Sequence, residues 1–533
     1  MKNILSLPLI SAALFAAASL HSADKYFGPS SAVFTSNTAW FSDEAKTEQT
    51  TPPTSGDDTA IFYKTKGEAS YAPTAWVTQI DTYVGNIVSV GNNGIINLGK
   101  ELLNQSVPAN FQVYGKLSVQ ICDESGTMSF GTSFDSAEGS AAVELVFGEI
   151  ELGTQVYGGR TYDSYQSTSL YFDYRDSRVS SSLITVNGDV KIGGCAAEGV
   201  NSAATMYIGA DKMRVLGVMR FERNGWGFSN ATFDKASVLE LGGLVATNIG
   251  GDTTISNGTG GSFASEIVFK NAAGTDFQYI GAIVDDGNNR ADLSAINAVM
   301  NVTMDGEGTQ RIFQAVQSKT DILGRMGGTY AAKSGRLFMD NSRIAADYRL
   351  AALSLEGGRF GAGHYDSSQA GTAYFKTANF QSGGLAYENF ANHNAVETQA
   401  SDKIIITETF SKAAGSGKIS VDFSDRNGNA LDLQNYAIAD DVSGIESWVE
   451  ILSAGSLDGF DLESKLGGNI YDANGDFYAI GIENGVAVFR WAESLEEGGY
   501  ALQVGFAQVP EPAVAAAILG ALALGLAARR RVG

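Results

Sequence analysis

The sequence predicts an all-β solenoid, with a right-handed parallel β-helix as the first choice and serial β-sandwiches as the alternative. Glycine accounts for 63 of the 533 residues, about 12% where an average chain has roughly 7%. Only eight residues are proline. Short runs in which apolar and polar residues alternate recur along the chain, mostly 20 to 40 residues apart. Period-two alternation is the strand pattern, and this spacing lies within the ~20–45-residue range of solenoid repeats.

The predicted strands lie between turn-forming Gly and Asn-Gly residues, at 116–121, 142–147, 183–186, 206–209, 238–241, 266–269, 337–339 and 353–355. One such unit cannot bury its apolar side alone, but stacked coils share a continuous core. We therefore expect a β-solenoid over residues 85–390. The many glycines fit coil corners that need a positive φ.

Different patterns flank this region. Residues 24–84 contain Trp40-Phe41 and then Pro-x-x-Gly-Asp and an apolar run at 53–62, which predict an N-terminal cap. Residues 391–508 contain the strand-like runs 402–406 and 417–423 and two Asn-Gly turns, which predict a C-terminal β subdomain that covers the last coil. Both flanks resemble the ends of autotransporter-like passenger solenoids. An apolar tail stands where autotransporters carry a membrane β-barrel, so the resemblance extends to architecture and not to self-translocation.

Residues 1–23 have the pattern of a secretory signal peptide. Lys2 precedes an apolar stretch at 4–20, and Ser22-Ala23 offer a cleavage site. We expect export through the Sec machinery. The alternative is an uncleaved membrane anchor.

The other end of the sequence, 509–533, has three parts in a fixed order. A Pro-Glu-Pro triplet precedes sixteen small or apolar residues at 513–528, and a basic tail follows: Pro510, Glu511, Pro512, Arg529, Arg530 and Arg531. As a helix the apolar segment would be about 24 Å long, slightly short of a ~30 Å hydrocarbon core, and the arginines would stay cytoplasmic. We expect a transmembrane helix here.

This order resembles the PEP-CTERM sorting signal of Gram-negative bacteria. The resemblance implies an exosortase-type processing enzyme, transient inner-membrane anchoring and cleavage near the triplet. It also implies delivery to the cell surface or extracellular matrix, with extracellular polysaccharide or envelope components as partners. The alternative is a plain C-terminal anchor.

The charge balance excludes several classes of function. The chain has 36 Lys and Arg against 59 Asp and Glu, a formal net charge of −23, so it lacks the cationic surface that nucleic-acid binding needs. Only three histidines occur, and no Gly-x-Ser-x-Gly motif is present. We therefore expect no organic cofactor and no catalytic residues.

The segment 157–174 combines five tyrosines with alternating Arg and Asp: Tyr157, Tyr162, Tyr165, Tyr171 and Tyr174. Tyrosine offers a flat apolar ring and a polar tip, which suit contact with sugar rings. The alternative is that the segment packs over the solenoid, which the residue pattern favours.

Cys122 and Cys195 are the only cysteines. After export they would be able to form a disulfide if neighbouring coils brought them together, and two buried thiols are an equal alternative.

One loop has oxygen ligands at positions 1, 3, 5 and 12 of a calcium loop: Asp472, Asn474, Asp476 and Glu483. Phe477 stands at position 6, where that loop requires glycine, and the flanking runs predict strands instead of helices. An ordinary hairpin turn is favoured, and calcium is the only metal ion that the sequence suggests.

These observations together predict an exported structural or adhesive protein of the cell surface or matrix, without enzymatic turnover. The alternatives are a secreted polysaccharide lyase or glycoside hydrolase on a β-helix, and a glycan-binding module centred on the tyrosines. Carboxylates and arginines that converge in one groove would favour the enzyme. A smooth face of Thr, Asn and Ser would favour the structural role.

Overall fold

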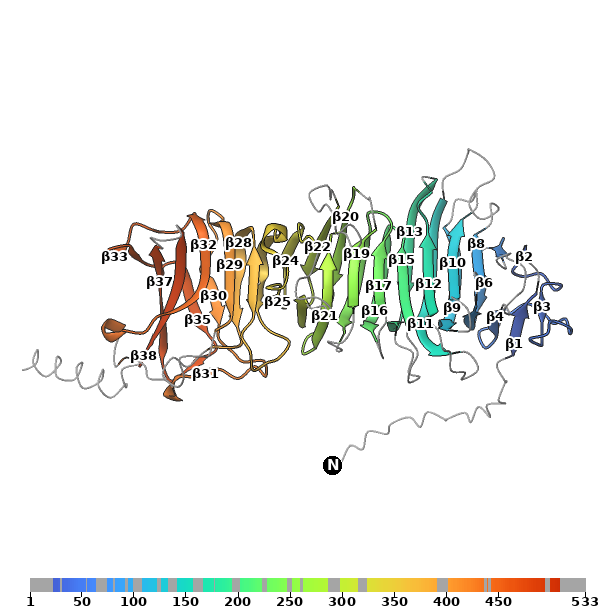
Figure 1. Ribbon diagram of the computed structural model, residues 1–533, viewed down its shortest axis with the longest axis horizontal. Helices are drawn as coiled ribbons and strands as arrows, with labels where there is room; N and C mark the ends of the chain where they lie inside the picture. The colour runs from blue at the N-terminus through green and yellow to red at the C-terminus, as the bar shows by residue number, and fades with distance from the viewer. Residues whose placement is uncertain are drawn as a thin grey trace, which may run out of the picture.

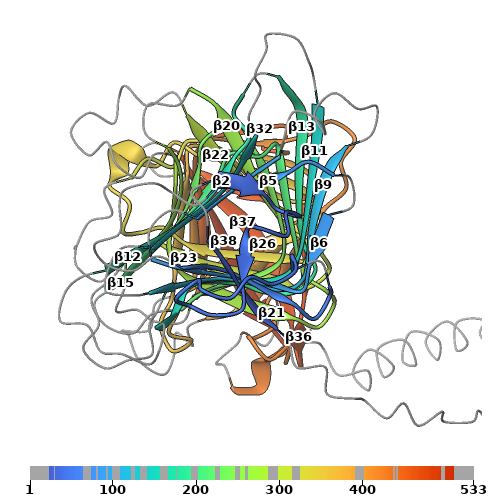
Figure 2. The same cartoon turned by 90° about the vertical axis from the view of Figure 1, so that its right-hand side faces the viewer.

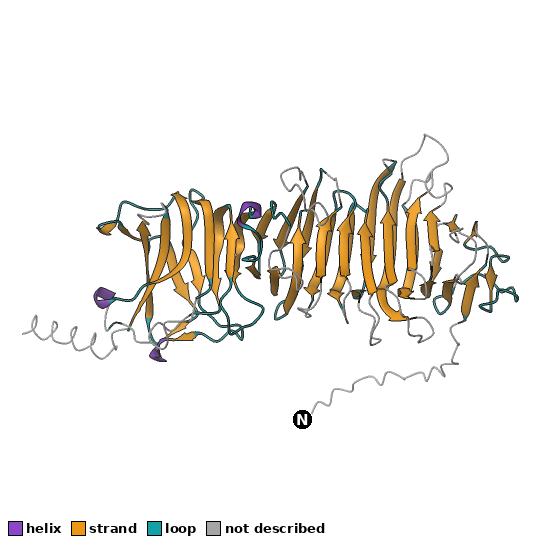
Figure 3. Ribbon diagram, in the orientation of Figure 1, coloured by secondary structure: helices purple, strands orange, loops and turns teal. Residues whose placement is uncertain are grey.

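A computed structural model describes residues 23–508 except 29–30, 54, 64–73, 80–81, 92–93, 99–107, 122–125, 133–140, 157–165, 177, 194–201, 223–227, 247–251, 259–261, 286–297, 315–323, 391–400, 436–438, 440–441 and 494–498. Strands stacked side by side form an elongated body with loops at its edges (Figures 1 and 3). The helical elements of this described part are the short 3₁₀ turns η3 (Ala346–Tyr348), η4 (Leu433–Asn435) and η5 (Val442–Gly444). The all-β prediction is confirmed.

Three faces run along the long axis, and each coil of the chain passes through them in turn (Figure 2). Within each face, strands of successive coils pair in parallel. Long strands such as β11 (Ala141–Val156) bend at a corner and contribute to two faces. These ladders confirm the parallel β-solenoid, whereas its right-handedness stays a prediction.

Face 1 consists of β2 (Ser31–Val33), β5 (Thr74–Val77), β8 (Gly94–Leu98), β10 (Gly126–Thr132), β12 (Gln166–Asp173), β15 (Ser202–Ile208), β17 (Phe228–Phe233) and β19 (Asp252–Asn257). The end of β21 (Asp276–Val284) continues it, and farther along β27 (Thr372–Phe375) pairs with the beginning of β29 (Lys403–Lys412).

Face 2 consists of β6 (Thr82–Val84), β13 (Val179–Val186), β20 (Ala264–Phe269), β22 (Val299–Met304) and β24 (Thr329–Ala332), with parts of β11, β29, β9 (Ala109–Ile121), β16 (Lys212–Phe221), β18 (Val238–Val245), β26 (Ala352–Ala362), β28 (Thr377–Tyr387) and β32 (Val449–Asp458).

Face 3 consists of β1 (Asp24–Phe27), β4 (Thr59–Tyr63), β7 (Asn86–Val90), β14 (Val190–Ile192), β23 (Thr309–Gln314), β25 (Arg336–Asp340), β30 (Ile419–Asp422) and β35 (Phe477–Ile480), with the remaining parts of β9, β11, β16, β18, β21, β26 and β28. This face carries the candidate site.

Antiparallel pairing occurs at the two ends of the stack. At the first end β3 (Trp40–Phe41) pairs with β1, and the fully buried Trp40 closes the core there. At the other end β32 is followed by β38 (Tyr500–Ala507), β37 (Val486–Glu493), β34 (Ile470–Asp472) and β33 (Lys465–Gly467). A separate parallel pair joins β31 (Leu431–Asp432) to β36 (Ile482–Glu483). The parallel ladders continue across both predicted domain boundaries, from β4 to β7 and from β28 to β30.

Side chains that point inward stack on their equivalents in the next coil. On face 1 one inward column runs through Met128, Leu170, Met206, Ala231 and Ile255, all fully buried. In the neighbouring column the Phe130 ring of β10 stacks on the Phe172 ring of β12, with ring centroids 5.7 Å apart. The alternation that predicted the strands is thus the alternation between core and surface, and every predicted run lies within or overlaps an observed strand.

A column of glycines forms the corner between faces 2 and 3 in successive coils: Gly85, Gly115, Gly148, Gly188, Gly217 and Gly242. Their backbones approach closely, and the Gly188 N–H donates to the Gly148 carbonyl at 2.7 Å. A Cβ on Gly242 would lie 2.6 Å from the Gly217 oxygen. None of these six has a positive φ, so the expectation that corner glycines supply positive φ is wrong for this column. Glycine is needed at these positions because the backbones of adjacent coils approach too closely for a side chain.

Gly148→Ala is expected to lower the free energy of unfolding by about 1–3 kcal/mol, because the new methyl group would lie against the carbonyl oxygens of Tyr114 and Gly115. Thermal unfolding followed by circular dichroism measures the effect. Gly475→Ala is the matched control, since a Cβ there meets no atom within 4 Å. Equal unfolding temperatures for the two variants would contradict the steric role of the corner.

Candidate functional site

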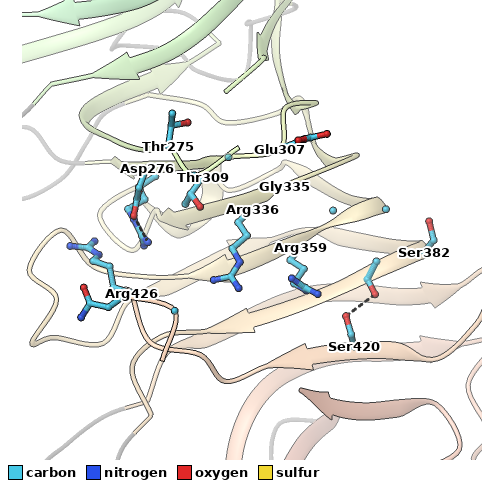
Figure 4. A pocket seen from close by; sticks show the side chains of 18 of the residues that line it. Thr275, Asp276, Glu307, Thr309, Gly335, Arg336, Arg359, Ser382, Ser420 and Arg426 are labelled. Atoms are coloured by element: carbon cyan, nitrogen blue, oxygen red, sulfur yellow. Dashed lines mark hydrogen bonds and ion pairs between the residues drawn. The ribbon is translucent and has the colours of Figure 1, made fainter. Parts of the chain in front are cut away.

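An open groove of about 700 Å³ lies on the outer side of face 3, over β21, β23, β25, β26 and β28. Gly417, Lys418 and Ser420 around the beginning of β30, the turn at 426–428 and Tyr478 of β35 also contribute to its lining. Figure 4 shows arginine, threonine and serine side chains from several successive strands around this hollow. A chain with a net charge of −23 is expected to have few positively charged surfaces. This groove gathers several cations, and it is therefore the candidate site.

Glycines at the corner keep the groove open. Gly335, Gly357 and Gly383 of three successive coils line it, with φ of +57°, +147° and +97°. These conformations are strained for residues with a Cβ, and the missing side chains leave the backbone as one wall. At these three glycines the expectation that coil corners need a positive φ is confirmed.

Two arginines stand side by side on neighbouring strands. Arg336 of β25 and Arg359 of β26 are direct register partners, so about 4.8 Å separates their backbones. Both reach Oδ2 of Asp422, Arg336 at 2.7 Å and Arg359 at 3.4 Å. The Asp422 side chain is only 3% exposed, whereas the two arginines are 26% and 36% exposed. One buried carboxylate therefore holds two cations that remain accessible from the groove.

Arg311 forms the most buried part of the groove floor. Its guanidinium donates to Asp276 on one side, with Nε 2.8 Å from Oδ1, and to Glu388 on the other side, with Nη2 2.8 Å from Oε1. It also lies 4.6 Å from the centre of the Phe338 ring. Because the Arg311 side chain is 3% exposed and fully engaged, its role is to support the floor.

Arg426 has fewer partners. Its Nε lies 3.9 Å from Glu388 Oε2, and this buried nitrogen has no hydrogen-bond acceptor. Burial and the neighbouring Arg311 lower the pKa of Arg426. Arg311 and Arg426 both contact Glu388, and Arg426 Nη2 also donates to the His364 carbonyl at 3.5 Å.

The local charge balance differs from that of the whole chain. Five cations line the groove, namely Arg311, Arg336, Arg359, Lys418 and Arg426. Two carboxylates line it, Asp276 and Glu307, and Asp422 and Glu388 lie beneath. The groove is therefore slightly positive inside an acidic protein, and its exposed groups are mainly the cations.

The predicted tyrosine site is only partly described. Tyr157, Tyr162 and Tyr165 lie outside the described residues. Tyr174 is 1% exposed and packs in the core, where burial raises its pKa, so it is no surface contact. Tyr171 lies on the outer side of face 1, where its ring stacks on that of Tyr207 at 4.2 Å.

A column of hydroxyl-bearing side chains lies on the outer side of face 1. Beside Tyr171 and Tyr207, the register places Ser129, Thr232 and Ser256 in the same column. This is the Ser- and Thr-lined face that the sequence analysis associated with a structural role. The molecule thus carries both a polar face and, on another face, a groove of arginines and carboxylates.

The predicted calcium loop is a turn whose side chains are already engaged. Asp476 pairs with Lys412 Nζ at 2.6 Å and accepts the Asp461 N–H. Asp472 accepts the Asn474 N–H, and Glu483 is exposed in β36. The described residues contain no group of three or more His, Cys, Asp or Glu side chains that could hold a metal ion.

The remaining predicted residues lie outside the part that the structure describes: Cys122, Cys195, Pro510, Glu511, Pro512, Arg529, Arg530 and Arg531. Among the described residues, no helix has the length and apolar character to cross a membrane, and segment 513–528 is not one of them. The disulfide and the sorting signal stay predictions.

The arginine groove was missed in the sequence. A Gly-Arg pair recurs at 335–336 and 358–359, one coil apart, and this repeat places the two arginines in register. Asp422, however, lies on β30, three strands along the face 3 ladder from β25, which carries Arg336. Only the stacking of the coils brings Asp422 beneath both arginines.

The fully buried Asp402 supports the far side of this network and titrates abnormally. It accepts backbone N–H groups of Gly371, Glu388 and Asn389 at 2.8–3.1 Å, and burial raises its pKa from 3.8 to about 7. A raised pKa means that the folded state binds the proton more tightly than the unfolded state. This contribution to stability is complete below about pH 4 and is lost as the pH rises through 7.

Asp402→Asn is therefore expected to remove a fall in stability of a few kcal/mol between about pH 4 and 7. Urea unfolding at a series of pH values measures the slope. Asp57→Asn, at an exposed aspartate of the first coil, is the control. If the Asp402→Asn variant keeps the pH slope of the parent, the assignment to Asp402 is wrong.

No family model matched this chain, and searches of curated proteins and of solved structures gave no match. The functional conclusion therefore depends on the geometry of the molecule and on the sequence patterns at its ends.

Proposed function

We propose that this protein is an exported component of the cell surface or extracellular matrix that binds an acidic polysaccharide in the face 3 groove. The observation that carries the proposal is the pair Arg336 and Arg359, held side by side in an open groove of a strongly acidic chain. Guanidinium groups bind carboxylate and sulfate groups through paired hydrogen bonds. A polyanion would otherwise be repelled by the net charge, so its attachment needs such a local cationic site.

The shape of the groove favours a polymer over a small ligand. It is open to solvent and is lined by residues of successive coils from β21 to β35, so it extends over several coils along the solenoid axis. Rim charges of this kind contribute salt-dependent attraction, and the paired arginines supply specificity for acidic groups.

Export and sorting form the second part of the proposal. The N-terminal pattern supports passage through the Sec machinery, and the resemblance of 509–533 to PEP-CTERM signals supports processing by an exosortase-type enzyme. A protein delivered in this way would meet extracellular polysaccharide. The uncharged polar side of face 1 is consistent with a structural or adhesive component.

A polysaccharide-active enzyme is the second candidate, because arginines and carboxylates do converge in the groove. The carboxylates at its floor are, however, held by guanidinium groups, Asp422 by Arg336 and Asp276 by Arg311. Their oxygen atoms are therefore engaged in hydrogen bonds within the protein and do not face a bound sugar. Binding without turnover is therefore the favoured function.

Binding is tested with polygalacturonate as the acidic polymer and dextran as the neutral one. The triple variant Arg336→Gln/Arg359→Gln/Asp422→Asn removes both cations together with the carboxylate that would otherwise stay buried and unpaired. It is expected to lose at least about tenfold in affinity for polygalacturonate, measured by titration calorimetry at low salt. Dextran is expected not to bind in this groove.

A matched control exists on face 2, where Lys212 and Arg214 both bind Glu240 at 2.6 and 2.8 Å. Lys212→Gln/Arg214→Gln/Glu240→Gln changes the net charge equally and should leave binding intact. An equal loss in both variants would mean nonspecific attraction and would overturn the groove assignment. Release of new sugar chain ends during incubation would establish the enzyme instead.

The sorting proposal is tested by intact mass of the protein from its host, fraction by fraction. The parent is expected to end near Val509 in the surface fraction. A Pro510→Ala/Glu511→Ala/Pro512→Ala variant is expected to stay in the inner membrane with its arginines. A surface-fraction protein that still carries Arg529 to Arg531 would identify the tail as a plain anchor.

A further inference from the structure

The register of face 3 places the groove residues in one row parallel to the solenoid axis. Going along the coils, the row contains Thr309, Arg336, Arg359, Gly384, Ser420 and Tyr478. Adjacent strands are separated by about 4.8 Å. Both guanidinium groups extend toward the last coil as far as Asp422 of β30, the strand that pairs with β35 of Tyr478. The row thus contains two cations and ends with an aromatic ring.

The middle of the row has no large side chain of its own. Gly384 has no side chain, and the small Ser420 side chain turns to the backbone, donating to the Gly383 carbonyl at 3.1 Å. Gly357, Gly358 and Gly383 line the same stretch of the groove. A ligand that lies against the arginines therefore has a low, open path toward the last coil.

Tyr478 stands at the end of that path. It is 46% exposed and lines the groove, while Phe477 beside it on β35 points into the core. A tyrosine ring offers a flat apolar face and a polar tip, which suit contact with a sugar ring. Lys418 also lines this end of the groove.

We propose that Tyr478 is a stacking subsite for a sugar ring of the same acidic polysaccharide, which lies along the solenoid axis with acidic groups on Arg336 and Arg359. This inference rests on the proposed function and adds a direction to the ligand. A single galacturonate unit at the arginines leaves the Tyr478 ring uncovered, whereas a chain of several units covers it.

The test compares monomeric galacturonate with polygalacturonate. Tyr478→Ala is expected to weaken binding of the polymer roughly fivefold or more and to leave binding of the monomer unchanged. Tyr478→Phe retains the ring and should bind as the parent does. Tyr114→Ala removes another exposed tyrosine, outside the groove lining, and is the control.

A second readout needs no variant. Polygalacturonate is expected to protect Tyr478 from nitration by tetranitromethane, whereas monomeric galacturonate is not. The modified peptide is measured by mass spectrometry. If the polymer binds in an arginine-dependent manner but Tyr478 is neither protected nor required, the subsite is refuted and the proposed function stands. If the arginine variant binds the polymer as the parent does, the proposed function itself fails.

Discussion

Close stacking of successive backbones at the glycine corner is the constraint on which the rest of the molecule depends. Each coil must turn from face 2 to face 3 while its N–H groups reach the carbonyls of the previous coil, as Gly188 does with Gly148. A side chain at that point would separate the coils and break the ladders on both sides. Once the corner is fixed, residues of equivalent position in successive coils fall into rows.

These rows explain how an acidic chain makes a cationic groove. Two arginines that are 23 positions apart in the sequence become neighbours because their strands are register partners. Their mutual repulsion is offset by Asp422, which a third segment brings beneath them. Because Asp422 is buried, most of the exposed charge that remains is positive, and this separation of buried acid from accessible base determines what the groove attracts.

The two sides of the solenoid differ in chemistry for the same reason. On face 1 one column of stacked outward residues is hydroxyl-bearing, as with Tyr171 and Tyr207, whereas face 3 contains the stacked pair Arg336 and Arg359. A single fold thus presents a neutral polar face and a cationic groove along one axis. A matrix component that binds an acidic polymer in one place and offers an uncharged face in another would suit assembly within extracellular polysaccharide.

The sequence by itself determined the fold class, because period-two alternation, glycine content and repeat spacing report local conformation and burial directly. It also supplied the predictions for both ends, which depend on short contiguous patterns. Tertiary structure alone decided the site. Tyr174 shares its local composition with Tyr171, yet one is in the core and the other outside. Likewise Asp422 and Arg336 are 86 residues apart, and no local pattern links them. Which side chains meet across coils depends on every loop length and strand register along the stack. These contacts therefore cannot be predicted from any one repeat.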